Sequence, residues 1–315
     1  MNKTLRTAMA VGATVAVPAL ANALIRARSQ TAANTLGGEE HYFSWRQGDI
    51  FYTTAGEGSP LLLVHGIGAG NSSYEWQHNF LPLSESFRVY ALDLLGFGLS
   101  DRPRLAYRGR IYVDLLHDFV EQVICEPANA IASSLSAAYL VETAALIPES
   151  FLRLMLVSPC GVTRLNTPPG LAGKVAAFAL RAPVWGQTAY NMITSRRAIG
   201  HQLRDTFYAN PESVSEPMIR HYHRSSHQRG AREVVAAFIG GYLNLDARES
   251  FAALDLPLKL VWGQEARYCP VDDAPAWLEL NPRAELTVIE EAGEMPHAEQ
   301  PLLFNAVVQE QLRGR

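Results

Sequence analysis

The chain has 315 residues, of which 48% are hydrophobic and 18% charged, and its formal net charge is −4. This length predicts either one large α/β domain with an inserted lid or two small domains, and the composition indicates a substantial core. A negative net charge without a basic cluster argues against nucleic-acid binding. The three cysteines are too few and too scattered to predict a disulfide framework or a zinc site.

The chain opens with an uncharged stretch at residues 8–25, which basic residues flank on both sides. A membrane-spanning helix needs roughly 17–25 apolar residues, so the run is just long enough, although Gly12, Pro18 and Asn22 interrupt it. Residues 1–28 therefore form a membrane anchor, a signal peptide cleaved near "ALANA", or a helix docked on the domain. The first two predict a membrane-associated or exported protein, and the third a cytoplasmic one. Residues 29–40 read as a polar linker.

From residue 41 the chain alternates between strand and helix patterns. "HYFSW" and "IFYTTAG" predict an antiparallel hairpin. Further strands are predicted at "LLLVHG", "FRVYALDLLG", "ANAIAS", "LRLMLVSP", "LKLVWG" and "AELTVIEEAG", and helices at "SYEWQHNFLPLSES", "YVDLLHDFVEQVI", "AAYLVETAALI" and "QPLLFNAVVQEQL". This order predicts a mostly parallel sheet with helices on both faces, and reactive groups at the carboxyl ends of its strands.

Residues 162–250 break this alternation, because helix follows helix without a strand pattern. We expect this segment to be a lid over a core built from residues 41–161 and 251–315. Its aromatic residues mostly fill the lid core, and a few should face a pocket. The run "HYHRSSH" places His223 and His227 four residues apart, but His221 lies off their face and no carboxylate is near, so a solvated helix is predicted rather than a metal site.

Five motifs occur in order along the chain, each at or after the end of a predicted strand: "HGIGAG", "DLLGFGLSDRP", "ASSLSA", "WGQEARYCPV" and "AGEMPHAEQP". Their order and spacing resemble the α/β-hydrolase superfamily over roughly residues 41–312. The lid-bearing branch that they resemble includes ester hydrolases, carbon–carbon bond hydrolases, epoxide hydrolases and haloalkane dehalogenases. The resemblance implies an α/β-hydrolase fold without an organic cofactor.

The third motif fits the nucleophile elbow, a strained strand-to-helix turn with small residues two positions before and after the nucleophile. Ala132 and Ser136 make Ser134 the candidate, whereas Ser133 would put Ile131 at a position that must be small. A serine argues against the epoxide and dehalogenation chemistries, which in the resembled families use an aspartate. The other interpretation is a serine tolerated at an idle elbow.

The resemblance also places an oxyanion hole, which uses the backbone N–H after the nucleophile and one from the loop after an earlier strand. By position these belong to Leu135 and Ile67. Backbone donors do not depend on side chains, so the hole can persist even where the triad does not. His65 fits the histidine of this loop and is expected to shape it.

The acid and the base of the triad are both substituted. Resembled enzymes carry an aspartate three residues after the glycine of "WG", where this chain has Ala266, and Pro270 supports the register. Glu265 is adjacent but should point elsewhere, and the other site for an acid holds Ser158. Glu294 stands at the position of the histidine base.

His297 matches a second, usually non-catalytic histidine of the resembled enzymes and is an alternative base. The acid exists to orient and stabilise an imidazolium, so the loss of both indicates that the pair was replaced as a unit. Two functions remain. The first is a serine-type hydrolase of an apolar ester or related acyl compound that uses Ser134 with Glu294. The second is a retired hydrolase scaffold that binds a small apolar ligand.

Overall fold

The computed structural model describes residues 3–28 and 32–312, and its centre is an eight-stranded sheet in the order β1-β2-β4-β3-β5-β6-β7-β8. β2 runs antiparallel to β1 and β4, and β3 to β8 are parallel to one another. The strands are β1 (Glu39–Trp45), β2 (Gly48–Ala55), β3 (Pro60–Val64), β4 (Arg88–Leu92), β5 (Ala128–Ser133), β6 (Phe151–Val157), β7 (Leu258–Gly263) and β8 (Glu285–Ile289). The predicted hairpin and the mostly parallel sheet are confirmed.

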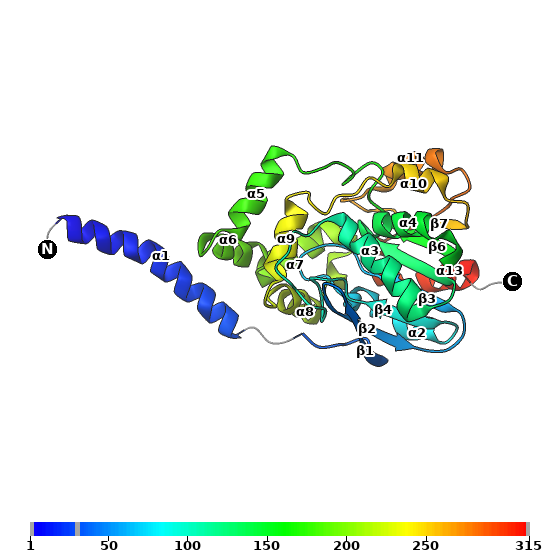
Figure 1. Cartoon of the computed structure of the whole chain (residues 1–315), viewed down its shortest axis with the longest axis horizontal. Coiled ribbons are helices and arrows are strands. Elements are labelled where there is room, and N and C mark those ends of the chain that lie inside the picture. The colour runs from blue at the N-terminus through cyan, green and yellow to red at the C-terminus, as the bar shows by residue number, and fades with distance from the viewer. Residues whose placement is uncertain (1–2, 29–31, 313–315) are drawn as a thin grey trace.

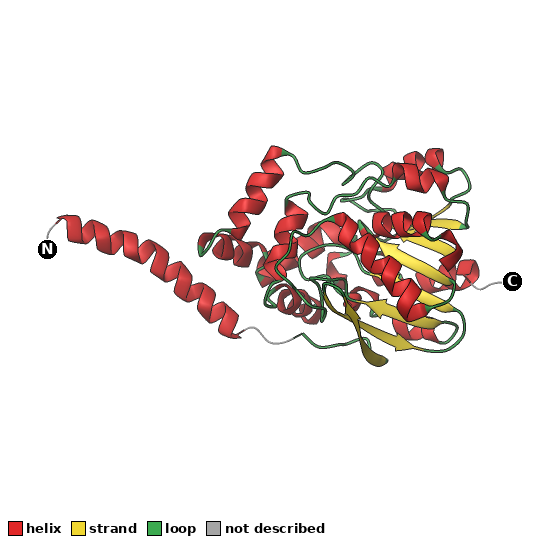
Figure 2. Cartoon of the chain, in the orientation of Figure 1, coloured by secondary structure: helices red, strands yellow, loops and turns green. Residues whose placement is uncertain are grey.

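Helices cover both faces of the sheet, as Figure 2 shows. The larger hydrophobic core packs α3 (Gly109–Phe119), α4 (Ser136–Leu146), α10 (Arg248–Ala253) and α11 (Ala274–Leu280) on one face. A second core packs α2 (Phe80–Ser84) and α13 (Pro301–Leu312) on the other face. Strands β3, β5 and β7 are buried along their whole length, which explains their uninterrupted apolar runs. This is the α/β-hydrolase fold that the sequence implied.

One predicted helix was wrong in its extent. "SYEWQHNFLPLSES" forms a 3-10 turn at Ser73–Trp76 and, separately, the short α2. The Ser72 side chain caps the turn, and the Asp93 carboxylate accepts from the N–H of Ser73 at 2.6 Å. These local side-chain hydrogen bonds compete with a continuous helix.

Residues 158–257, between β6 and β7, contain only helices and loops, and they include residues 162–250, the segment that the sequence predicts to be a lid. Its main helices are α5 (Leu171–Arg181), α6 (Trp185–Ile193), α7 (Arg196–Gln202), α8 (Glu216–Ser226) and α9 (Ala231–Ile239), with a π-helical turn, η4 (Leu203–Phe207), after α7. A third hydrophobic cluster joins η4 and α8 to Met295 beside β8, so this part of the lid packs on the loop that carries the "AGEMPHAEQP" motif.

Helix α1 (Lys3–Arg28) extends away from the body, and its C-terminal half runs beside α6 (Figure 1). Within the described residues, no helix has the combined length and apolar character needed to cross a bilayer. The expected linker, residues 29–40, differs in part: Glu39 and Glu40 already belong to β1, and residues 29–31 lie outside the described residues.

Candidate active site

Ser134 occupies a sharp turn between the end of β5 at Ser133 and the start of α4 at Ser136. Its φ of 54° is in the left-handed region, which costs a residue other than glycine about 1–3 kcal/mol and is concentrated at functional sites. The N–H of Ser134 donates to the Val157 carbonyl at 2.9 Å, which ties the turn to β6. A Cβ on Gly66 would lie 3.4 Å from Cβ of Ser134, so the "HGIGAG" loop touches the elbow closely. The turn therefore has the geometry of a nucleophile elbow.

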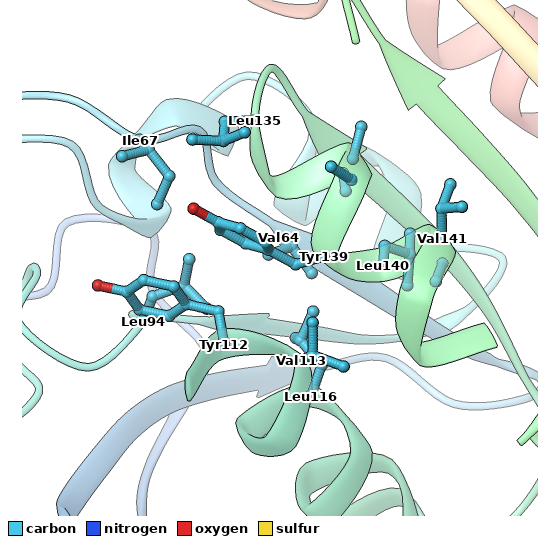
Figure 3. Close-up of a cluster of buried hydrophobic side chains, with 14 of the residues drawn as sticks. Val64, Ile67, Leu94, Tyr112, Val113, Leu116, Leu135, Tyr139, Leu140 and Val141 are labelled. Carbon is cyan, nitrogen blue, oxygen red and sulfur yellow. The ribbon is translucent and has the colours of Figure 1, made fainter. Parts of the chain in front are cut away.

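The backbone amides of Ile67 and Leu135 donate to no acceptor in the described part of the chain. Both side chains are buried in the larger core, and Figure 3 shows them in one cluster with Tyr139 and Tyr112. Their packing holds the two amides in place, because buried side chains have little freedom to move. Two unsatisfied amides beside a strained serine are the donors that an oxyanion hole requires.

The histidine of the same loop, His65, is fully buried and hydrogen-bonded on both ring nitrogens. Its Nε2 accepts from the Leu94 N–H at 3.0 Å, so Nδ1 carries the proton and donates to the Gly66 carbonyl at 2.7 Å. The hydroxyl of Ser136 donates to the His65 carbonyl at 2.7 Å. His65 thus joins the loops after β3 and β4 to the start of α4.

Glu294 is 5% exposed, and its carboxylate is held by backbone amides of the loop after β7. Its Oε1 accepts from the N–H groups of Tyr268 and Cys269, the latter at 2.8 Å. Burial raises the pKa of Glu294 to about 7, and the backbone hydrogen bonds oppose part of that rise. Glu294 is therefore a group that exchanges its proton near neutral pH.

The amides that hold Glu294 belong to the residues two and three positions beyond Ala266. An aspartate commonly accepts from the amides two or three residues after it, so an aspartate at position 266 would use the same two donors. The side chain of Glu294 thus accepts the hydrogen bonds that an aspartate at position 266 would accept.

Neither of the other candidates for the acid, Glu265 and Ser158, binds the amides of Tyr268 and Cys269. Glu265 turns away from the site, since its Oε2 accepts from the Ala292 N–H at 2.9 Å. Ser158 lies at the end of β6 with φ 40°, and its hydroxyl is buried without a hydrogen-bond partner among the described residues.

His297, the alternative base, is fully buried in an ion pair with Glu75, and the distance from His297 Nε2 to Glu75 Oε1 is 3.3 Å. Its ring packs on Trp76, with centroids 4.4 Å apart. Burial alone would raise the pKa of Glu75, but the neighbouring His297 outweighs burial and lowers that pKa. His297 is thus engaged with a carboxylate and is not hydrogen-bonded to Ser134.

Glu75 is a site residue that the sequence analysis missed. Its Oε2 accepts from the Gly66 N–H at 2.9 Å and from the Asn71 side chain at 3.2 Å. It therefore stabilises the loop that carries the Ile67 amide. Only its spatial neighbours reveal this role, because the letters "SYEW" have no distinctive pattern.

The expectation that the cysteines form no disulfide framework needs correction, because Cys160 and Cys269 form a disulfide across 109 residues of chain. The bond joins the loop after β6 to the loop that holds Glu294. Cys160 Sγ lies 4.0 Å from Ser134 Oγ, and Cys269 supplies one of the amides bound by Glu294. Cys125 is free and exposed. Spacing could not reveal a pair that only the fold brings together.

A small cavity of about 30 Å³ joins Ser134, Glu294, Glu75 and Ile67. Its apolar lining comes from Leu203, Phe207, Tyr222 and Met295. Such a volume holds one or two waters, whereas ligand sites usually measure roughly 300–1,000 Å³. Leu203, Phe207 and Tyr222, from the segment between β6 and β7, therefore narrow the space beside the serine.

Hydrogen bonds fasten the lid to the segment that carries Glu294. The N–H of Glu294 donates to the Phe207 carbonyl at 2.8 Å. The carboxylate of Glu299 accepts from Gly293 at 2.6 Å and from Ala209, in the lid, at 2.8 Å. Gly293 is needed here, because a Cβ would lie only 2.5 Å from the Phe207 carbonyl oxygen. Opening the site requires these contacts to break.

Known hydrolases resemble this chain along most of its length. It is 26% identical to 2-hydroxymuconate semialdehyde hydrolase of Pseudomonas sp. (strain CF600), over 81% of this chain and 87% of that protein. It is 27% identical to pimeloyl-[acyl-carrier protein] methyl ester esterase of Aeromonas hydrophila subsp. hydrophila, over 81% of this chain and 95% of the esterase.

A solved structure shows the same fold. The meta-cleavage product hydrolase of Pseudomonas fluorescens IP01 superposes with a TM-score of 0.72 at 24% identity, covering 89% of this chain and 98% of that one. The family model described as "Alpha/beta hydrolase family" matches residues 61–307, which include the elbow, the lid and Glu294. This protein therefore belongs to the α/β hydrolase family.

Proposed function

We propose that the protein is a serine-type hydrolase of an apolar ester or related acyl compound, with Ser134 as nucleophile and Glu294 as base. The observation that supports this most directly is the shared cavity, where a strained serine and a buried carboxyl meet beside two unsatisfied amides. Its apolar lining favours an apolar substrate. The ester and carbon–carbon bond hydrolases among its relatives favour a hydrolytic reaction.

In this mechanism Ser134 Oγ attacks the acyl carbon while its proton passes to the Glu294 carboxylate. The amides of Ile67 and Leu135 donate to the developing oxyanion. Glu294 then returns the proton to the leaving alcohol, and an acyl-serine remains. Water hydrolyses that ester by the same steps, again with Glu294 as base. A pKa near 7 suits a group that both accepts and donates a proton at neutral pH.

One observation favours the second candidate, a retired scaffold that binds a small apolar ligand. Among the described residues, Ser134 Oγ hydrogen-bonds to no carboxylate or imidazole, and its one polar contact is Cys160 Sγ at 4.0 Å. Hydrogen bonds of active sites often tighten only when substrate binds, so a free Ser134 hydroxyl in the unliganded protein is compatible with a hydrolase.

A fluorophosphonate probe distinguishes them. We expect slow labelling of Ser134 in the wild-type protein, because the elbow presents the hydroxyl beside its oxyanion donors. Ser134→Ala should abolish labelling, and Ser133→Ala is the matched control that should keep it. Mass spectrometry of the labelled peptide identifies the site. An unlabelled wild-type protein after long incubation at several pH values would support the binding protein instead.

We also infer that the folded body resides in an oxidising compartment, so that the N-terminal segment serves export or membrane attachment. The Cys160–Cys269 disulfide supports this, because such bonds persist in secreted and periplasmic proteins and are rare in the cytosol.

The disulfide carries its own prediction. Protein alkylated without reductant in its native host should yield a linked Cys160–Cys269 peptide and a modified Cys125. Cys269→Ala should lower the free energy of unfolding by about 2–4 kcal/mol, since the bond closes a long loop, and Cys125→Ala is the control. Recovering Cys160 and Cys269 as free thiols from the native host would contradict an oxidising compartment.

A further inference from the structure

An exposed apolar face covers the end of the molecule that carries the N-terminal helix and part of the lid. Leu171 and Phe178 on α5 are 80% and 79% exposed, and Trp185 and Met192 on α6 are 55% and 68% exposed. Leu20 and Leu24 on α1 are 63% and 50% exposed. We call these six side chains the lid face. Figure 1 shows α1, α5 and α6 at the end of the molecule opposite α13. Large apolar patches of this kind mark interaction surfaces.

The N-terminal helix is attached to the lid through one buried polar residue. Asn22 is 6% exposed, and its Nδ2 donates to the Val184 carbonyl at 3.0 Å and to the Thr188 hydroxyl at 3.1 Å. Asn191 donates back to Asn22 Oδ1 at 2.9 Å. These contacts fix α1 against α6, so the exposed apolar side chains of both helices lie at the same end of the molecule.

A cationic cavity of about 780 Å³ lies at the same end of the molecule, and residues near the C-terminus of α1 and on α6 contribute to its lining. Its lining contains five arginines, Arg26, Arg102, Arg104, Arg229 and Arg232, but only two carboxylates, from Asp101 and Glu233. Glu233 is already shared by Arg181 and Arg232. Arg102 already donates to the Ser100 and Gly98 carbonyls, so the arginines that remain for a ligand are Arg26, Arg104 and Arg229, with Arg232 shared with Glu233. The positive excess suits phosphate, which guanidinium groups bind through paired hydrogen bonds.

We propose that the lid face docks on a bilayer of anionic phospholipid and that the arginine cavity receives a headgroup phosphate. Exposed apolar side chains and arginines at one end of the molecule supply the two forces that hold proteins at such bilayers, burial among acyl chains and attraction to anionic headgroups. Because Asn22 joins α1 to the lid, docking places the lid at the lipid surface. This inference is independent of the chemistry at Ser134.

A second copy of the chain fits the same surface less well. A two-fold contact uses the same patch on both partners. It would bring the arginine clusters of both copies into one interface, where like charges repel. Free phosphate would satisfy the cavity but would leave the apolar side chains exposed.

Vesicle flotation of the full chain tests the proposal. We expect binding to phosphatidylcholine vesicles that contain phosphatidylglycerol, and much weaker binding to phosphatidylcholine alone. Arg104→Gln with Arg229→Gln should weaken binding to the anionic vesicles by about 25-fold, or about fivefold for each arginine. Phe178→Ser with Trp185→Ser should weaken binding to both kinds of vesicle by about tenfold or more.

The matched controls are Leu302→Ser, on α13 with an 86% exposed side chain, and Arg110→Gln, on α3. Both should bind as the wild type does. If the variant with Phe178→Ser and Trp185→Ser binds vesicles as tightly as wild type, the proposal is overturned, because α1 alone would then be sufficient for binding. A dimer that the same variant dissociates, without vesicle binding, would also overturn it, as would binding of glycerol phosphate without binding of vesicles.

Discussion

Glu294→Gln should lower kcat/KM for an activated ester by about 100-fold or more, the usual contribution of a general base. The glutamine oxygen can still accept from the amides of Tyr268 and Cys269, so the loop keeps its shape while the base is lost. In the wild-type protein only the carboxylate can take the proton of Ser134. Its kcat/KM should therefore rise with pH up to about 7 and then level off.

The same substitution should stabilise the protein at alkaline pH. Below about pH 4.5 the carboxyl of Glu294 is protonated in both states. As the pH rises towards 7, the unfolded chain releases the proton while the folded chain keeps it, so the wild-type protein loses stability. The loss is complete above pH 7 and amounts to about 3 kcal/mol.

The measurement is the pH dependence of kcat/KM and of the free energy of unfolding for wild type and Glu294→Gln. The free energy of unfolding of the variant should exceed that of wild type by up to about 3 kcal/mol at pH 8, and the two should be equal near pH 4. Glu265→Gln, on the neighbouring loop but outside the cavity, is the matched control and should change neither profile. If Glu294→Gln keeps the wild-type rate and profile, Glu294 is not the base.

The sequence predicted the elements and the elbow because both depend on local pattern. Strands β3 and β5 are short apolar runs, and the small residues around Ser134 are required by the turn itself. The same local reasoning predicted that Ala266 stands where an acid belongs, since Pro270 fixes the register. The turn at Ser73–Trp76 was the exception, because capping by Ser72 interrupted an apparently helical run.

The rest of the site depends on contacts between distant segments. Glu75 meets His297 across 222 positions of the chain, and Cys160 meets Cys269 across 109. The local sequence around either residue of such a pair does not identify its partner. The position of the Glu294 carboxylate was equally hidden, because a glutamate in place of a histidine does not reveal which donors it reaches. Fold topology, not residue type, decides these pairings.

Ala266→Asp combined with Glu294→His should give a variant that hydrolyses short activated esters at least about tenfold faster than wild type, which corresponds to about 1.4 kcal/mol of barrier. Glu294→His alone should do little, since an imidazole without an acid is not held in one tautomer and its charged form is not stabilised. It also leaves the buried amides of Tyr268 and Cys269 without their carboxylate, at about 1–3 kcal/mol each.

Ala266→Asp alone should also do little, because two carboxylates would then compete for the same pair of amides and each would disfavour the ionisation of the other. In the double variant the introduced aspartate would take those amides and orient the introduced histidine. The two changes should therefore couple by about 2 kcal/mol in stability, as contacting residues do. Their effect on rate should likewise be strongly non-additive, as for triad members.

The comparison is the esterase rate and the free energy of unfolding for wild type, both single variants and the double variant, on one substrate. Ser134→Ala in the double background is the control that assigns any gain to the elbow. If wild type hydrolyses the ester faster than the double variant, Glu294 takes part in a mechanism other than that of a Ser-His-Asp triad. That result would exclude the retired scaffold. If stability couples but the rate does not rise, the carboxylate has been exchanged as expected, but the introduced pair does not activate Ser134.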